Sequence, residues 1–226
     1  MPSLLAQPKR EFCCTIRNSW PETEKDQVAE IEQFGTPIDY IKLCADAEVV
    51  FLGQTVSNEP VRNHLWQNAA ALKEAGVTHF AIEFNQMPWT SDYKRLCHKL
   101  SASGIKIILA DVDQRRTRDS EQREAHMTKC ITDILEAEPG AKVAALFSSF
   151  HAGRYIMDGL RPAAVRIESA KYSLIRLRYF GGAEYTPTLI TQPAWNAGLG
   201  SFALDMRPYG ADAPFGGDAD FGLYLG

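Results

Sequence analysis

The strongest constraint on the fold is a regular alternation of short apolar runs with longer helical segments through the middle of the chain. The apolar runs are residues 48–53, 79–84, 106–110 and 142–147. The segments between them, which have apolar side chains three or four positions apart, are residues 59–75, 91–103 and 119–138. Strands that alternate with helices at this spacing are typical of βαβ units, whose strands are parallel.

The predicted strands are apolar at successive positions as well as at alternate ones, which is expected when helices cover both faces of a sheet. We therefore predict an α/β fold in which a mostly parallel sheet is flanked by helices on both faces. Glycines end two of the predicted helices, at Gly76 and Gly104. Two further helical segments precede the first strand, at residues 22–34 and 38–45.

The C-terminal third of the chain departs from this pattern. Residues 173–180 alternate apolar with basic side chains, which predicts a strand near an edge of the sheet with one solvated face. Residues 201–206 predict one more short strand. The tail after it is rich in glycine, and we expect it to pack through Phe221, Leu223 and Tyr224. Residues 1–22, which contain three prolines, are predicted to form an irregular arm, and residues 23–226 a single domain.

Composition excludes several classes of protein. Of the 226 residues, 45% are hydrophobic and 23% are charged, which is ordinary for a globular protein with one substantial core. The formal net charge of −4 gives no basic field for nucleic acid, so we expect no nucleic-acid partner. We expect no membrane partner either, because neither a secretory signal nor a run of roughly 18 apolar residues is present. The five cysteines are best interpreted as reduced thiols. Together these features favour a cytoplasmic protein.

Polar residues gather where the predicted strands end. In an open parallel sheet, ligands bind beyond the carboxyl ends of the strands. Glu83 is the most informative of these residues because it closes an otherwise apolar strand, where burial alone would raise the pKa of its carboxyl group. A general base is one interpretation, and a carboxylate that caps a neighbouring helix is the other. Gln54 and Ser57 follow the first strand.

The segment FSSFHAGR, residues 147–154, follows the fourth strand. Its His151 could relay protons or bind a metal, or only hydrogen-bond the loop. Arg154 could hold an anionic group or pair with an acidic loop. On the helix at residues 119–138, Arg123 is open to a functional or a solvated reading, whereas His126 is expected to be solvated. Asp111 and Asp113 have a spacing that suits a hard cation, but we favour a salt-bridged loop with the arginines at positions 115, 116 and 118.

Taken in order, these segments resemble a superfamily that joins the ChaN-type haem-binding proteins, the TraB and Tiki proteins, and the erythromycin esterases. The resemblance covers residues 46–214. It is carried by VVFLGQTVSNEPVRNHLWQ, LKEAGVTHFAIEF, KIILADVD, REAHMTKCITDIL, KVAALFSSFHAGR and SFALDMRPYGADAP. In that superfamily the first loop usually reads Gly-Glu-x-His, the second strand ends in Glu, and a later strand is followed by a histidine-containing turn. Gly53, Glu83 and His151 match these positions.

The first loop departs from the superfamily pattern, because Gln54 stands in place of the glutamate and Val56 in place of the histidine. A glutamine keeps an acceptor oxygen but carries no charge, and a valine neither binds a metal nor takes a proton. The resemblance therefore implies a site that has lost ligands a catalytic metal needs. Haem binding would need an axial ligand, for which His64, His151 and Tyr155 are candidates.

Two functions from different classes follow from this resemblance. The first is a metal-independent enzyme for a small organic or peptide-derived substrate, with Glu83 and His151 as an acid/base pair. Substrate would be bound by Gln54, Ser57, Arg123 and Arg154. The second is a relative that binds haem or another small molecule without turning it over. We predict no cofactor, with haem or a divalent metal as the open alternative, and we leave both a monomer and a homodimer open.

Overall fold

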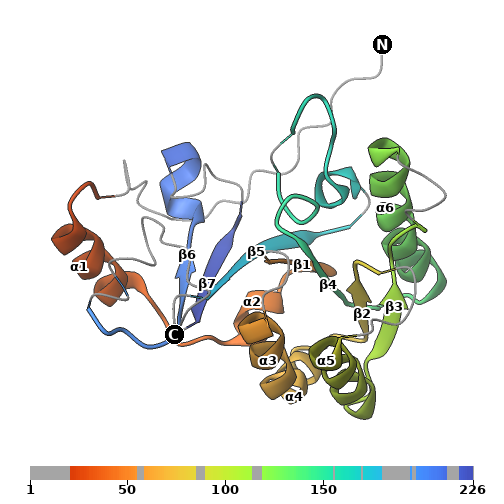
Figure 1. Cartoon of the computed structure of the whole chain (residues 1–226), viewed down its shortest axis with the longest axis horizontal. Coiled ribbons are helices and arrows are strands. Elements are labelled where there is room, and N and C mark those ends of the chain that lie inside the picture. The colour runs from red at the N-terminus through yellow and green to blue at the C-terminus, as the bar shows by residue number, and fades with distance from the viewer. Residues whose placement is uncertain are drawn as a thin grey trace.

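The predicted strands assemble into one sheet at the centre of the molecule (Figure 1). The computed structural model describes residues 21–54, 59–84, 90–113, 119–154, 156–168, 170–179, 194, 197–212 and 219–225. Within them the strands are β1 (Val49–Gln54), β2 (His79–Ile82), β3 (Lys106–Leu109), β4 (Val143–Ser148), β5 (Tyr172–Tyr179), β6 (Phe202–Asp205) and β7 (Phe221–Leu225). Their order across the sheet is β3-β2-β4-β1-β5-β7-β6.

The pairing of the strands confirms the predicted α/β class. Strands β1 to β5 run parallel to their neighbours, β7 runs parallel to β5, and β6 pairs antiparallel with β7. In the register, Gln54 lies opposite Ser148, and Ile82 lies opposite Leu146. The carboxyl ends of β1, β2 and β4 therefore meet at one edge of the sheet.

Helices cover both faces of the sheet. They are α1 (Glu24–Phe34), α2 (Tyr40–Cys44), α3 (Glu59–Gln67), α4 (Ala69–Glu74), α5 (Ser91–Ala102) and α6 (Ser120–Ala137), with short 3₁₀ helices η1 (Ala163–Arg166) and η2 (Arg207–Asp212). Helices α2 to α5 pack on one face, where Leu65, Leu72 and Leu96 are fully buried against the sheet. Helix α6 packs on the other face through Met127 and Ile131. Figure 1 shows α6 and the α3–α5 group on different sides of the strands.

The helix ends follow local sequence signals. Asp119 caps α6 by accepting hydrogen bonds from the backbone N–H groups of Glu121 and Gln122. Gly76 follows α4 with φ of 87°, in the left-handed region that glycine adopts without a steric cost. The segment 59–75, predicted as one helix, forms two. The interruption lies at Asn68, whose backbone leaves helical geometry while its side-chain amide donates to the carbonyl of His64 at 2.8 Å.

The predicted position of the strand at 173–180 was wrong. Strand β5 lies between β1 and β7, and Ser173 through Leu177 are buried, including Arg176 with 6% of its surface exposed. The cause is the C-terminal tail, which forms β7 and adds to the sheet beyond β5. Leu223 and Tyr224 of this strand are fully buried, as expected for the tail, and Phe221 is half-buried.

Helix α1 and strand β6 complete the end of the sheet near the tail. Ile31 of α1 packs with Phe202, whose ring stacks on Tyr224 at a centroid distance of 4.9 Å. Of the predicted N-terminal arm, residues 1–20 lie outside the described residues. No helix in the described part of the chain combines the length and the apolar character that a membrane span requires.

Candidate functional site

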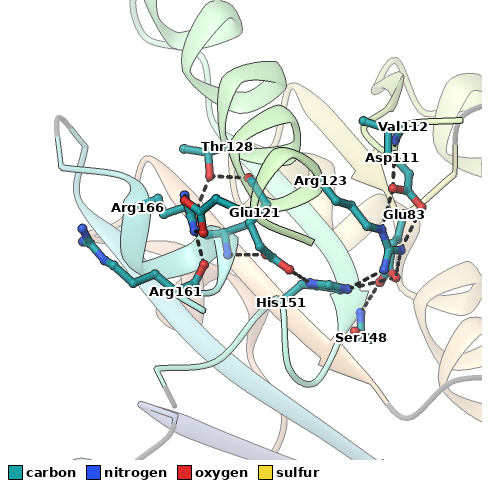
Figure 2. A network of polar contacts seen from close by, with 12 residues as sticks. Glu83, Asp111, Val112, Glu121, Arg123, Thr128, Ser148, His151, Arg161 and Arg166 are labelled. Atoms are coloured by element: carbon teal, nitrogen blue, oxygen red, sulfur yellow. Dashed lines mark hydrogen bonds and ion pairs between the residues drawn. The ribbon is translucent and has the colours of Figure 1, made fainter. Parts of the chain in front are cut away.

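Glu83 and His151 lie next to each other at the carboxyl edge of the sheet (Figure 2). Glu83 directly follows β2, and His151 lies in the turn that follows β4. Because β2 and β4 are neighbours, the two side chains meet, with His151 Nε2 3.4 Å from Glu83 Oε1. The prediction that they converge is confirmed. That they act in catalysis stays a prediction.

The carboxylate of Glu83 is held from two sides. Its Oε2 accepts a hydrogen bond from the backbone N–H of Ser148 at 2.6 Å, and its Oε1 accepts one from Arg123 Nη2 at 2.6 Å. Burial raises the pKa of Glu83, but hydrogen bonds and charge from His151, Ser148 and Arg123 outweigh burial and lower it. Glu83 is therefore ionised at neutral pH.

Arg123 links three acidic or basic side chains. In the first turn of α6, its Nε and Nη2 each donate to the carboxylate of Asp111 at 2.8 Å, and its Nη1 lies 3.1 Å from His151 Nε2. The hydrogen bonds to Asp111 and the charge of Glu83 raise the pKa of Arg123 further above its usual value. Asp111 was expected to pair with the arginines at 115, 116 and 118, which lie outside the described residues; it pairs with Arg123.

Glu124 is a member of this site that the sequence analysis missed. Its Oε1 forms an ion-pair contact with His151 Nδ1, and its Oε2 accepts from the backbone N–H of Ala163 at 2.7 Å. Its side chain is 1% exposed. A signal was available, since Glu124 lies three residues before Met127 and seven before Ile131, on the apolar face of the helix. A carboxylate on that face needs a buried partner.

The two carboxylates control the charge of His151. Burial lowers the pKa of His151, but hydrogen bonds and charge from Glu124 and Glu83 outweigh burial and raise the pKa to about 9. Below that pH the ring is an imidazolium, with Nδ1–H directed at Glu124 and Nε2–H near Glu83. When Nε2 loses its proton, it can accept a hydrogen bond from Arg123 Nη1. Both protonation states of Nε2 therefore have a partner.

The site is a compact ionic cluster that is partly exposed on one side. Three carboxylates, those of Glu83, Asp111 and Glu124, face the cations Arg123 and His151. The side chains of Arg123 and Glu83 are 23% and 19% exposed, whereas Asp111 and Glu124 are almost fully buried. The Glu83–Arg123 side of the cluster is therefore its more exposed side, although both side chains remain half-buried.

Gln54 points to the opposite face of the sheet. Its Nε2 donates to the hydroxyl group of Tyr93 on α5 at 2.7 Å. Gly53, the residue before Gln54, lets the turn that carries His151 approach β1 closely. A Cβ atom at Gly53 would lie only 3.3 Å from the Cβ of Ala152, so a larger residue would crowd the turn. The matched glycine thus has a steric role.

Arg154 pairs with Asp220 at 2.7 Å, and the other oxygen of Asp220 accepts from the backbone N–H of Leu174 at 2.9 Å. This contact connects the turn after β4 with the segment before β7. A substrate-binding role for Arg154 stays a prediction. Ser57 and Tyr155 lie outside the described residues.

Two other histidines, His64 and His126, lie outside this cluster. His64 lies 3.0 Å from the hydroxyl of Tyr40, and burial lowers the pKa of His64. His126 is exposed, as expected. Within the described residues, no group of three or more His, Cys, Asp or Glu side chains is arranged to hold a metal ion. The guanidinium of Arg123 lies between Glu83 and Asp111, where it balances the charge that a cation would balance in a metal centre.

Comparisons with known proteins assign no family. No protein-family profile and no curated protein matches the chain. Among solved structures, the type III effector HopBA1 is similar with a TM-score of 0.47 and 13% identity, over 84% of this chain and 95% of its own. RRSP, a MARTX toxin effector domain from Vibrio vulnificus, is similar with a TM-score of 0.41 and 16% identity, over 65% of this chain. This chain spans 40% of RRSP. Likenesses at this level identify no activity.

Proposed function

We propose that this protein is a metal-independent enzyme that hydrolyses a small organic or peptide-derived substrate by acid/base chemistry, in the manner of the ChaN/erythromycin esterase-like superfamily. The observation that carries the proposal is the contact between Glu83 Oε1 and His151 Nε2 at 3.4 Å, with Glu124 on the other ring nitrogen. Glu124 orients the imidazole through Nδ1, and Glu83 faces the other ring nitrogen, Nε2. Together the three groups form a proton-transfer unit.

The charges assign a role to each group. The carboxylate of Glu83 accepts a proton from a water molecule as the water oxygen attacks the carbonyl carbon of the substrate. The imidazolium of His151 donates its Nε2 proton to the oxygen or nitrogen of the leaving group as the bond from the carbonyl carbon breaks. The proton on Glu83 then passes to His151, which restores both groups and leaves the elements of water in the two products. Arg123 stabilises negative charge on the carbonyl oxygen.

Turnover of a panel of esters, amides and lactones tests this proposal. We expect Glu83→Gln and His151→Asn each to reduce kcat/KM by about 10²-fold or more, which is the usual contribution of a general acid or base. Glu121→Gln is the control, because Glu121 is a glutamate on α6, the helix that carries Arg123 and Glu124, but it pairs with Arg166 at the surface. Full turnover by the Glu83→Gln protein would refute the assigned roles.

The second candidate is a protein that binds a ligand without converting it. It is favoured by the internal pairing of the site, since both oxygens of Glu83 accept hydrogen bonds and the Nε and Nη2 atoms of Arg123 donate to carboxylates. A ligand that binds equally well to the native and Glu83→Gln proteins, with no member of the panel consumed, would select this candidate.

We also propose a cytoplasmic location. The support comes from Cys44 and Cys97, which are buried and free, and burial raises the pKa of each thiol to about 11. Such protonated, unpaired thiols suit a reducing compartment. Recovery of the protein in a membrane or secreted fraction of its native cells would contradict this assignment.

A further inference from the structure

A second polar cluster lies on the face of the sheet opposite His151. It consists of Gln54 at the end of β1, Arg62 on α3, and Asp92 and Tyr93 on α5, and we name it the Gln54–Arg62 cluster. The guanidinium of Arg62 forms an ion pair with Asp92 and lies over the ring of Tyr93, 4.5 Å from its centroid. Gln54 Nε2 donates to the Tyr93 hydroxyl. Tyr93 therefore joins the glutamine and the arginine.

Two buried polar atoms of this cluster have no hydrogen-bond partner within the described part of the chain: Gln54 Oε1 and Arg62 Nη1. Gln54 and Arg62 are only 3% and 5% exposed. A buried polar atom without a partner loses its hydration and gains nothing in return, so such atoms are rare in native proteins. An acceptor and a donor left open in the same cluster offer a ligand two points for hydrogen bonding.

The charges of the cluster define the chemistry of that ligand. Asp92 balances the charge of Arg62, so the cluster has no excess positive charge to attract an anion. A carboxylate would also face the oxygen of Gln54, which is an acceptor and repels it. An amide group offers both kinds of partner, because its N–H can donate to an acceptor such as Gln54 Oε1 and its carbonyl oxygen can accept from a donor such as Arg62 Nη1. An ester offers the carbonyl but no donor.

The cluster is connected to the Glu83–His151 site through adjacent residues. Glu83 reaches His151 on one face, and the ring of the next residue, Phe84, lies edge-on to Tyr93 with centroids 4.7 Å apart. Burial raises the pKa of Tyr93, and the charge of Glu83 adds to that rise, which shows that the two sites are within electrostatic range. Tyr93 and Phe84 are only half-buried, so the cluster reaches the surface at this edge.

We infer that the Gln54–Arg62 cluster recognises an uncharged amide group of the ligand, at a position distinct from the bond that reacts beside Glu83 and His151. This inference deepens the proposed function, on which its connection to catalysis rests. The substrate would be an amide-bearing compound, held by its amide against Gln54 and Arg62. Selection against carboxylate and ester analogues would follow from the unpaired acceptor of Gln54.

Binding of three matched probes tests the inference: 3-phenylpropanamide, its methyl ester analogue and 3-phenylpropanoate. The titrations are followed by NMR in the Glu83→Gln protein, where turnover does not interfere. We expect the amide to bind about tenfold more tightly than the ester, the ratio that one buried hydrogen bond supplies. The carboxylate should bind more weakly than the amide by a similar factor.

Variants of the cluster separate its two contacts. Gln54→Met removes the acceptor at nearly constant volume, so the amide should bind no better than the ester. Arg62→Lys keeps a cation beside Asp92 but removes the open Nη1 donor, and it should weaken the amide and the ester by the same factor. Gln27→Met is the matched control, because Gln27 is a buried glutamine that hydrogen-bonds the carbonyl of Pro21 far from this cluster.

Each outcome decides for or against the inference. Equal binding of amide and ester, an amide preference that survives Gln54→Met, or no binding of any probe at millimolar concentration would overturn it. Failure of the proposed function is recognised separately: it appears as absence of turnover in the native protein, while the amide preference of the Glu83→Gln protein persists. Turnover without amide preference would refute the recognition site alone.

Discussion

The pH dependence of stability should report the ion pairs of His151 directly. In the folded chain the pKa of His151 is raised from 6.5 to about 9, with burial opposing the rise and the carboxylates of Glu124 and Glu83 causing it. A raised histidine pKa stabilises the folded state fully below the unfolded pKa of 6.5, and this contribution is lost as the pH rises through 9. At about 1.4 kcal/mol per pKa unit, the contribution is about 3 kcal/mol.

The test compares the stability of the native chain with that of His151→Asn as the pH is raised. The free energy of unfolding is measured by urea titration, with tryptophan fluorescence as the signal, at about pH 6 and about pH 10. The native chain should exceed the variant by about 3 kcal/mol more at the lower pH than at the higher one. Buried thiols and other groups that titrate in this range are present in both proteins, so their effects cancel in the difference.

Two results would refute this reasoning. A difference in stability that stays constant between the two pH values would mean that His151 does not change its pKa on folding. A difference that grows as the pH rises would mean that the imidazole is held neutral, with burial prevailing over the two carboxylates. Histidine NMR titration of the folded chain gives an independent measure, since the resonances of His151 should shift near pH 9.

Three further predictions concern Glu124, Asp111 and Gly76. Glu124→Gln should lower the pKa of His151 by one unit or more, because Glu124 is a positioning residue that also holds the ring charged. The alkaline limit of kcat/KM should move down by the same amount. A pH profile of kcat/KM measures this shift, and an unchanged limit would contradict the prediction. Asp111→Asn should lower the free energy of unfolding by about 2 kcal/mol, because it removes the carboxylate paired with Arg123. Urea titration measures this change, and an unfolding free energy equal to that of the native chain would show that the pair does not stabilise the fold. Gly76→Ala should lower the stability of the fold by about 1 kcal/mol, because a φ of 87° strains any residue with a Cβ. The measurement is a lower Tm, and an unchanged Tm would show that the backbone relaxes there.

Local patterns predicted the elements that depend on nearby residues. The apolar runs that became β1, β2, β3 and β4 are flanked by helices whose ends coincide with Gly76 and Gly104. Their parallel arrangement follows from the alternation with helices, and it brings the carboxyl ends together. The meeting of Glu83 and His151 could therefore be predicted, since each stands at the end of a strand in the same parallel sheet.

Contacts between distant segments could not be predicted in the same way. The alternation of apolar and basic residues at 173–180 indicated a strand near an edge with one solvated face, but pairing with β7 placed β5 inside the sheet and buried Arg176. Glu124 was recognisable as a carboxylate on an apolar helix face, although its partner was not. Gln54 was predicted to lie in the same site as Glu83 because both stand at strand ends. It contacts Tyr93 on the other face of the sheet.

The sequence by itself determined the class of fold and the edge of the sheet at which the candidate site would lie, because strand and helix periodicities are local and parallel strands align their ends. The tertiary structure alone decided which charges balance one another. Arg123 takes Asp111 and Glu83, and Glu124 takes His151, through contacts between α6 and the ends of three strands. Such pairings depend on distances of a few ångströms between segments far apart in the chain, for which a single sequence has no periodic signal.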